Sequence, residues 1–189
     1  MATPASWVEL DVGDGNRAAS AARFVESAPD QLGPDGRAEL ARMAETAVAE
    51  AAAKGAVYVA CYSAVVEERP VSASLVVSVI EGRDRPPPPG ATRHVMAQGL
   101  ARVLGGAGTV AVRDLPAGPA VRVRTRAQAP VPFPDASGEQ EAEVENVQWF
   151  VPSADGRQLA LLAFSTPTLG LAESFGELFD AIAGTLRWE

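Results

Sequence analysis

The most constraining feature of this sequence is the pattern from Val147 to Trp188, which predicts two strands, a tight turn and an amphipathic helix. Residues 147–151 form a strand-like run, and Asp155-Gly156 supplies the residue types that hairpin turns favour because they tolerate positive φ. Residues 159–164 are apolar at every position, which predicts a central strand covered on both faces. After Thr166-Pro167, a predicted cap and first helical residue, one stripe at helical spacing contains Leu171, Phe175, Leu178, Phe179, Ile182 and Leu186. We therefore expect a helix across the sheet.

Composition limits the class of protein. The 189 residues suit a single globular domain, 1–189, and the formal charge of -8 argues against binding nucleic acid or anionic lipid. A basic protein partner remains compatible with that charge. The N-terminus lacks the pattern of a secretion signal, and no apolar run is long enough to span a bilayer, so we expect a cytoplasmic protein.

The first hundred residues predict a strand, two helices, a hairpin and a third helix. The strand covers residues 7–12, the helices 16–28 and 34–54, and the hairpin 56–66 and 71–80. The proline run of residues 81–90 predicts an extended connector. A helix from about Ala91 to Leu104 follows, whose predicted inward side chains are Val95, Leu100, Val103 and Leu104.

A charge pattern marks the next hairpin. Residues 121–126 alternate so that Arg122, Arg124 and Arg126 share one face, and Arg113 can join them from the preceding strand, residues 109–115. Glutamates then recur at every second position at Glu141, Glu143 and Glu145. We expect the two rows to pair across antiparallel strands, either as a binding face for a partner or as a self-satisfied ladder of cross-strand ion pairs.

A proline-rich loop, residues 127–140, joins these two rows. It carries Val131 and Phe133 between prolines, and such a stiffened loop either folds back on the core or offers its apolar side chains to a partner. We predict partner contacts at Arg113, Arg122, Arg124, Arg126, Val131 and Phe133.

The element order predicts an α/β (α+β) fold with a mainly antiparallel sheet of about six to seven strands and helices on both faces, an α/β/α sandwich. The closing pattern, residues 147–152 and 159–167 followed by a helix ending near Leu186-Arg187-Trp188, resembles the end of the Mog/PsbP-like superfamily, in particular its LpqN-like actinobacterial branch. The resemblance covers roughly the last third of the chain in pattern and the rest in element order. It implies a non-enzymatic factor that binds a partner protein.

Two classes of function follow. The first is a cytoplasmic adaptor, chaperone, or assembly or immunity protein. The second is a small-molecule or enzymatic site behind the serine-bearing strand, 71–80, lined by Tyr58, Tyr62, Ser72 and Ser74. The single histidine, His94, and the single cysteine, Cys61, have no partners at catalytic or metal-binding spacing, so we expect no enzyme activity, cofactor or metal.

Overall fold

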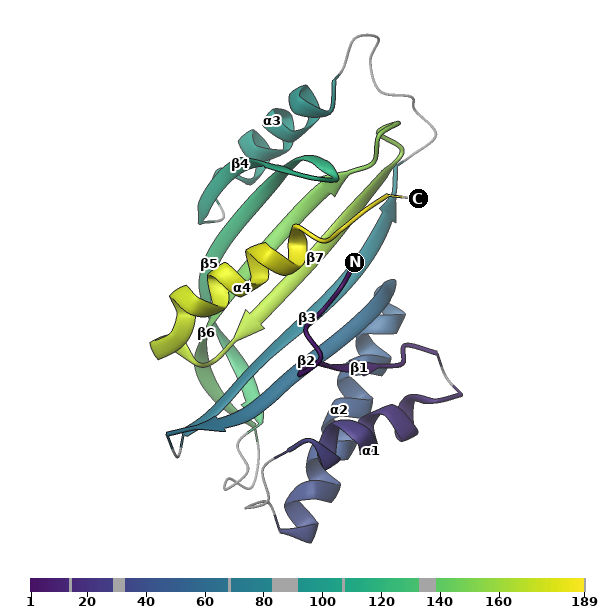
Figure 1. Ribbon diagram of the computed structural model, residues 1–189, viewed down its shortest axis with the longest axis vertical. Coiled ribbons are helices and arrows are strands. Elements are labelled where there is room, and N and C mark those ends of the chain that lie inside the picture. Colours follow the sequence, from purple (N-terminus) through teal and green to yellow (C-terminus); the bar gives the residue numbers. More distant parts are fainter. Residues whose placement is uncertain are drawn as a thin grey trace.

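The computed structural model describes residues 1–13, 15–28, 33–67, 69–82, 92–106, 108–132 and 139–188. Within these residues, seven strands form one antiparallel sheet in the order β1-β2-β3-β7-β6-β5-β4 (Figure 1). The predicted α+β fold and strand number are confirmed. The strands are β1 (Val8–Leu10), β2 (Ala56–Val66), β3 (Arg69–Glu81), β4 (Thr109–Leu115), β5 (Gly118–Pro132), β6 (Glu139–Pro152) and β7 (Gln158–Thr166).

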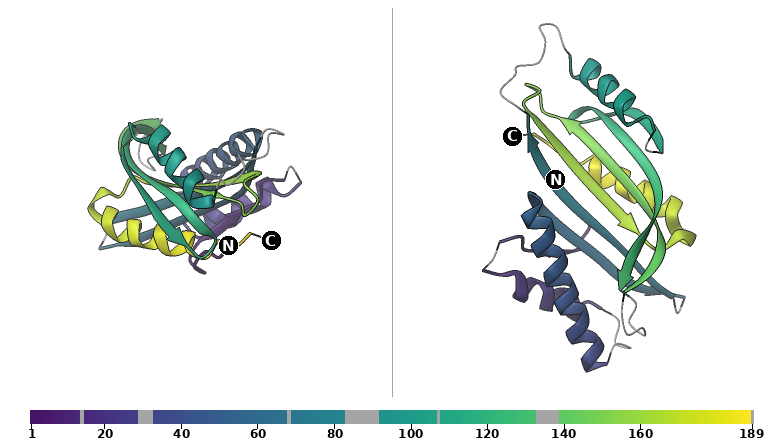
Figure 2. Two further views of the ribbon diagram at one scale, coloured as in Figure 1. Left: turned by 90° about the horizontal axis from the view of Figure 1, so that it is seen from above. Right: turned by 180° about the vertical axis from the view of Figure 1, so that it is seen from behind.

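Helices lie on both faces of this sheet, as Figure 2 shows. The helix α4 (Ala172–Ala183), preceded by the 3-10 turn η1 (Leu169–Leu171), packs on β6 and β7 on one face, which we call the α4 face. On the opposite face, α1 (Arg17–Glu26) and α2 (Pro34–Ala53) lie over the β1 and β2 end, and α3 (Arg93–Leu104) lies over β4 and β5. The predicted layering is therefore confirmed.

The main core lies under α4. Phe179 is fully buried and its ring stacks on Phe164 at 4.6 Å between centroids, while Phe175 and Trp7 approach the same ring at 5.6 and 6.4 Å. Alternating strand side chains supply the floor, among them Leu75, Val147, Trp149, Val151 and Leu162. The predicted stripe of the closing helix is thus confirmed at Phe175, Phe179 and Ile182, all of which are buried.

The opposite face has two smaller cores. Leu10, Phe24, Val48, Ala56 and Val59 pack between α1, α2 and the first strands. Ala97 of α3 packs on Val121 and Val123 of β5. Between these two cores β7 turns Leu159, Leu161 and Ala163 to this face, and all three are only half-buried. The expectation that β7 is central is confirmed, but it is fully covered only on its α4 face.

Turn residues behave as their chemistry requires. Gly156 adopts φ +69° in the β6–β7 hairpin, where Asp155 accepts hydrogen bonds from the Ser153 hydroxyl at 2.6 Å and the Arg157 N–H at 3.0 Å. Gly118, at φ +124°, starts β5, and a Cβ there would lie 2.5 Å from Arg93 Nη1, the atom that donates to the Ala117 carbonyl. This turn therefore needs glycine.

Two predictions about helices are wrong in detail. In α3, the predicted inward residues Leu100 and Leu104 do pack on the core between α3 and β5, but Val95 and Val103 are 54% and 82% exposed. The side that meets β5 also carries Ala97 and Ala101, whose small side chains let the helix approach closely. The closing helix begins at Ala172, not at Pro167. Thr166 instead ends β7 and donates to the Ser72 carbonyl at 2.7 Å. Most of the proline connector, residues 83–90, lies outside the described residues.

Candidate partner-binding site

The arginine row, Arg122, Arg124 and Arg126, lies on β5 and points to the α4 face, as the alternation predicts. The glutamates of β6 share that face, because the adjacent antiparallel strand places them opposite even-numbered residues of β5. The pairing of the two strands is confirmed, and the row lies beside the acidic flank of α4.

The register differs from the predicted one. Only Arg126 lies directly opposite a glutamate, Glu145, whereas Arg122 lies opposite Trp149 and Arg124 opposite Val147. Glu143 and Glu141 lie opposite Gln128 and Pro130. The reason is that β5 continues to Pro132, so that the hairpin closes farther along the chain and the two rows are displaced along the strands.

Residues 127–132 are therefore strand, where the sequence predicts loop. Prolines lack a backbone donor and are tolerated in a strand that has an unpaired side. That condition holds here, because β4 pairs with β5 only from Gly118 to Arg124. Val131 lies opposite Gln140, and Phe133 falls outside the described residues.

Glu145 is the centre of the charged cluster. Its side chain is 2% exposed and accepts hydrogen bonds from Arg124 Nε and, at 2.8 Å, from Arg126 Nε. Burial alone would raise the pKa of the Glu145 carboxyl, but the hydrogen bonds from the two arginines outweigh burial and hold that pKa below its ordinary value. Glu145 is thus a buried anion whose charge is matched inside the protein.

The rest of the row fastens α4 to the sheet. Arg124 Nη2 donates to Glu173 at 2.7 Å, and Arg122 Nε donates to Asp180 at 2.7 Å. The hydrogen bonds to Glu173 and then Glu145 raise the pKa of the Arg124 guanidinium, and the same contact lowers the pKa of Glu173. Arg122 and Arg124 are 17% and 24% exposed. Both arginines are occupied within the fold and present little free donor surface to a partner.

The other predicted contact residue, Arg113, lies on β4 at the edge of the sheet. It is exposed, pairs in register with Ala120 and shares the α4 face with the arginine row. Its guanidinium donates to the Val112 carbonyl at 3.3 Å. It stands apart from the cluster around Glu145.

The alternative ligand-lining residues do not form one site. Tyr58 and Tyr62 point to the α4 face, whereas Ser72 and Ser74 point to the opposite face, because Tyr62 pairs with Ala73 and side chains alternate along each strand. The Tyr58 hydroxyl lies 3.0 Å from Thr3 Oγ1, and the Tyr62 ring stacks on Trp7 at 6.2 Å. The structure separates the residues on which the alternative depends.

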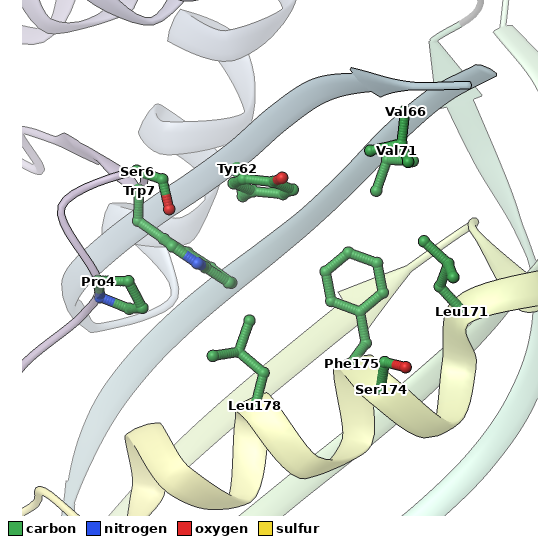
Figure 3. A pocket seen from close by; sticks show the side chains of 10 residues that line it. All are labelled: Pro4, Ser6, Trp7, Tyr62, Val66, Val71, Leu171, Ser174, Phe175 and Leu178. Carbon is green, nitrogen blue, oxygen red and sulfur yellow. The ribbon is translucent and has the colours of Figure 1, made fainter. Parts of the chain in front are cut away.

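A pocket that the sequence does not predict lies beside the other flank of α4. It has a volume of about 270 Å³, and Figure 3 shows the side chains around it, which come from the N-terminal segment, the β2–β3 hairpin and α4. We call it the edge pocket. It is lined by Pro4, Ser6, Trp7, Tyr62, Val66, Val71, Leu171, Ser174, Phe175 and Leu178.

The edge pocket is held in place by contacts between the two ends of the chain. The Ala2 N–H donates to Thr185 Oγ1 at 2.8 Å, and Trp7 packs edge-on against Phe179. Leu171 and Val66 at its rim are 38% and 45% exposed. The sequence places most of these residues on predicted strands or helices. Their meeting depends on contacts between distant segments, so no local pattern predicts the pocket.

Outside this pocket, the remaining chemical candidates are isolated. His94 is exposed on α3, and desolvation by burial raises the pKa of the Cys61 thiol to about 12, so that it stays protonated at neutral pH. Within the described residues, no three His, Cys, Asp or Glu side chains are grouped to hold a metal ion. In the same part of the chain, none of the helices combines the length and apolarity needed to cross a bilayer.

Comparison of the chain with protein families, curated proteins and solved structures finds no match. The resemblance to the Mog/PsbP-like superfamily therefore stays a prediction, and the geometry of the site is the basis for assigning a function.

Proposed function

We propose that this protein is a non-enzymatic protein-binding factor, of the adaptor, chaperone, or assembly or immunity type, and that it holds its partner at the edge pocket. The observation that carries the proposal is an open apolar pocket whose rim exposes Leu171 and Val66. Exposed apolar side chains gathered around a hollow are typical of sites that contact another protein.

The polar groups around the pocket favour binding over catalysis. They are the hydroxyls of Ser6, Ser174 and Tyr62, which orient a ligand by hydrogen bonds. An activated hydroxyl nucleophile needs a base within hydrogen-bond reach. The only histidine lies on α3, on the opposite face of the sheet from α4.

A small molecule is the second candidate occupant, since about 270 Å³ lies just below the usual range of ligand pockets. Two observations favour a protein instead. The rim of the pocket exposes Val66 at the end of β2, next to the exposed Val65, and the ligand-lining set expected from the sequence is divided between two faces. The cytoplasm remains the proposed compartment.

The arginine row has a different place in this proposal. The sequence predicts that the row contacts the partner. Arg126, its most exposed member, has a side chain that is 53% exposed. The hydrogen bonds of Arg122 and Arg124 to Asp180, Glu173 and Glu145 instead support a role in holding α4 on the sheet, and hence in the stability of the fold.

Affinity capture with matched variants tests the proposal. The whole protein and its Val66→Lys and Val103→Lys variants are immobilised, exposed to lysate of the native host, and the retained proteins are quantified by mass spectrometry. Val103 is the control because it is 82% exposed on α3, away from the pocket. We expect a protein retained by the wild type and by Val103→Lys but lost with Val66→Lys. Equal retention by all three proteins, or none by the wild type, would contradict the proposal.

A further inference from the structure

The edge of the sheet beside the pocket is only partly used. β1 has three residues and pairs with β2 from Val59 to Cys61. β2 continues to Val66, and residues 62–66 pair with β3 on their inner side. In the described part of the chain no strand pairs with their outer side, so every second backbone N–H and C=O there points away from the sheet.

Two other open edges carry protective residues. The outer strand β4 exposes Arg113 and Asp114, and the free end of β5 contains Pro130 and Pro132. Charges and prolines at such positions keep foreign strands from pairing. Residues 62–66 contain neither, and Val65 and Val66 are 39% and 45% exposed. Of these three edges, residues 62–66 are the one that carries no protective residue and is open to strand pairing.

The open edge leads into the edge pocket. Tyr62, Ala64 and Val66 share the α4 face, because they pair with Ala73, Val71 and Arg69 across β3. Tyr62, Val66 and Val71 line the pocket. A strand added beside residues 62–66 would therefore turn every second side chain to this face, toward the pocket, while its backbone bonds to β2.

The surrounding charge selects the occupant. Exposed glutamates lie near both ends of the open edge, Glu9 on β1 opposite Ala60 and Glu67 directly after Val66, and the chain as a whole carries a formal charge of -8. One cation, Arg69, lies across the β2–β3 turn. A basic segment complements these two glutamates.

A second copy of the chain fits poorly in the register centred on the middle of the open edge. If two copies of the edge pair antiparallel about Ala64, Glu67 of one copy falls opposite Cys61 of the other, the position that Val8 already occupies. Glu67 would also approach Glu9, a repulsive pair of like charges.

We infer that residues 62–66 of β2 accept an extended, basic segment of the partner protein as an added strand, with one of its apolar side chains seated in the edge pocket. This inference rests on the proposed function and specifies how the partner binds. The backbone hydrogen bonds between the added strand and β2 supply affinity, and the pocket supplies selectivity.

Selection from random linear peptides tests it. A displayed library of peptides of about seven residues, long enough to span this edge, is panned on the whole protein. We expect enriched sequences that are net basic and share one aromatic or branched apolar residue. The affinity of these peptides for the Val66→Lys variant should be lower than for the wild type by about tenfold or more, the size of effect expected when a central contact is lost. Their affinity for the Val103→Lys variant should be unchanged. Acidic sequences, no enrichment, or indifference to Val66→Lys would overturn the inference.

Backbone methylation separates strand addition from occupation of the pocket alone. Two versions of one selected peptide carry N-methyl groups at alternate residues. Strand addition predicts that one version loses binding and the other keeps it, because only every second N–H faces β2. Equal binding by both versions overturns strand addition while leaving partner binding at the pocket intact. A dimer that Val66→Lys dissociates would assign the edge to a second copy and likewise overturn the inference.

Discussion

The two flanks of α4 meet the sheet in opposite ways. On one flank, Glu173 and Asp180 bind Arg124 and Arg122, and the buried Glu145 completes a charged cluster beneath the helix. On the other flank, Leu171, Ser174 and Leu178 face an open apolar pocket. The charges of Arg122, Arg124 and Glu145 are thus matched within the protein, and the other flank is left open. A charge pattern becomes an interface only where its partners lie outside the fold.

Truncation of Phe179, on the buried side of α4 between its two flanks, should have the largest effect on stability. Phe179 is fully buried between Phe164, Phe175 and Trp7, so Phe179→Ala should lower the free energy of unfolding by about 3 to 5 kcal/mol. Chemical denaturation measures this. Val103→Ala, at an exposed site, serves as the control and should change stability by less than about 0.5 kcal/mol. Similar midpoints for Phe179→Ala and wild type would show that α4 is not part of the core.

A change on the charged flank should have the next largest effect on the free energy of unfolding. Glu145→Gln removes the buried anion and leaves Arg124 and Arg126 without their shared partner, which should cost about 2 to 3 kcal/mol. The value lies below that of a wholly buried pair because both arginines reach solvent. The matched change is Glu143→Gln, since Glu143 is exposed on the same strand and face. If the two variants unfold at the same denaturant concentration, the cluster does not stabilise the fold.

Acidic pH should reduce the stability that the charged flank contributes to the fold. The pKa values of Glu145 and Glu173 are lower in the folded protein than their ordinary values, so the stability from their ionisation is complete above the unfolded pKa of about 4.3. It is lost as the pH falls through the depressed folded pKa values. The melting temperature should drop below about pH 4.5, and it should drop less in Glu145→Gln. Parallel pH profiles for the two proteins would contradict this origin of acid sensitivity.

The open flank should tolerate charge. Val66 is 45% exposed at the end of β2, so Val66→Lys should change the free energy of unfolding by no more than about 0.5 kcal/mol. A thermal melt measures this effect. A loss comparable to that of Glu145→Gln would place Val66 in the core and remove the pocket rim from consideration as a free surface.

Local chemistry accounts for what the sequence predicts correctly. The alternation of residues 121–126, the turn at Asp155-Gly156 and the burial of Phe175, Phe179 and Ile182 on α4 each depend on neighbouring residues, and each is confirmed. The register of β5 and β6 was missed because Pro130 and Pro132 favour a loop unless one side of the strand is unpaired, a condition that only the end of β4 creates.

Features set by contacts between distant segments were not predictable. The edge pocket needs Trp7, β2 and α4 together, and no short pattern relates Trp7 to Leu171. The inward side of α3 was missed in part for a similar reason. Leu100 and Leu104 pack inward as predicted, but the close approach of the helix to β5 places Ala97 and Ala101 there in place of Val95 and Val103.

The most direct test measures partner capture per folded molecule for one variant on each flank of α4. Arg124→Gln removes a bond to Glu173 on the charged flank, and Leu171→Lys places a charge at the pocket rim. We predict that Arg124→Gln is less stable but captures its partner at the wild-type level per folded molecule, whereas Leu171→Lys keeps its stability and loses capture. Loss of capture with Arg124→Gln and normal capture with Leu171→Lys would contradict this account.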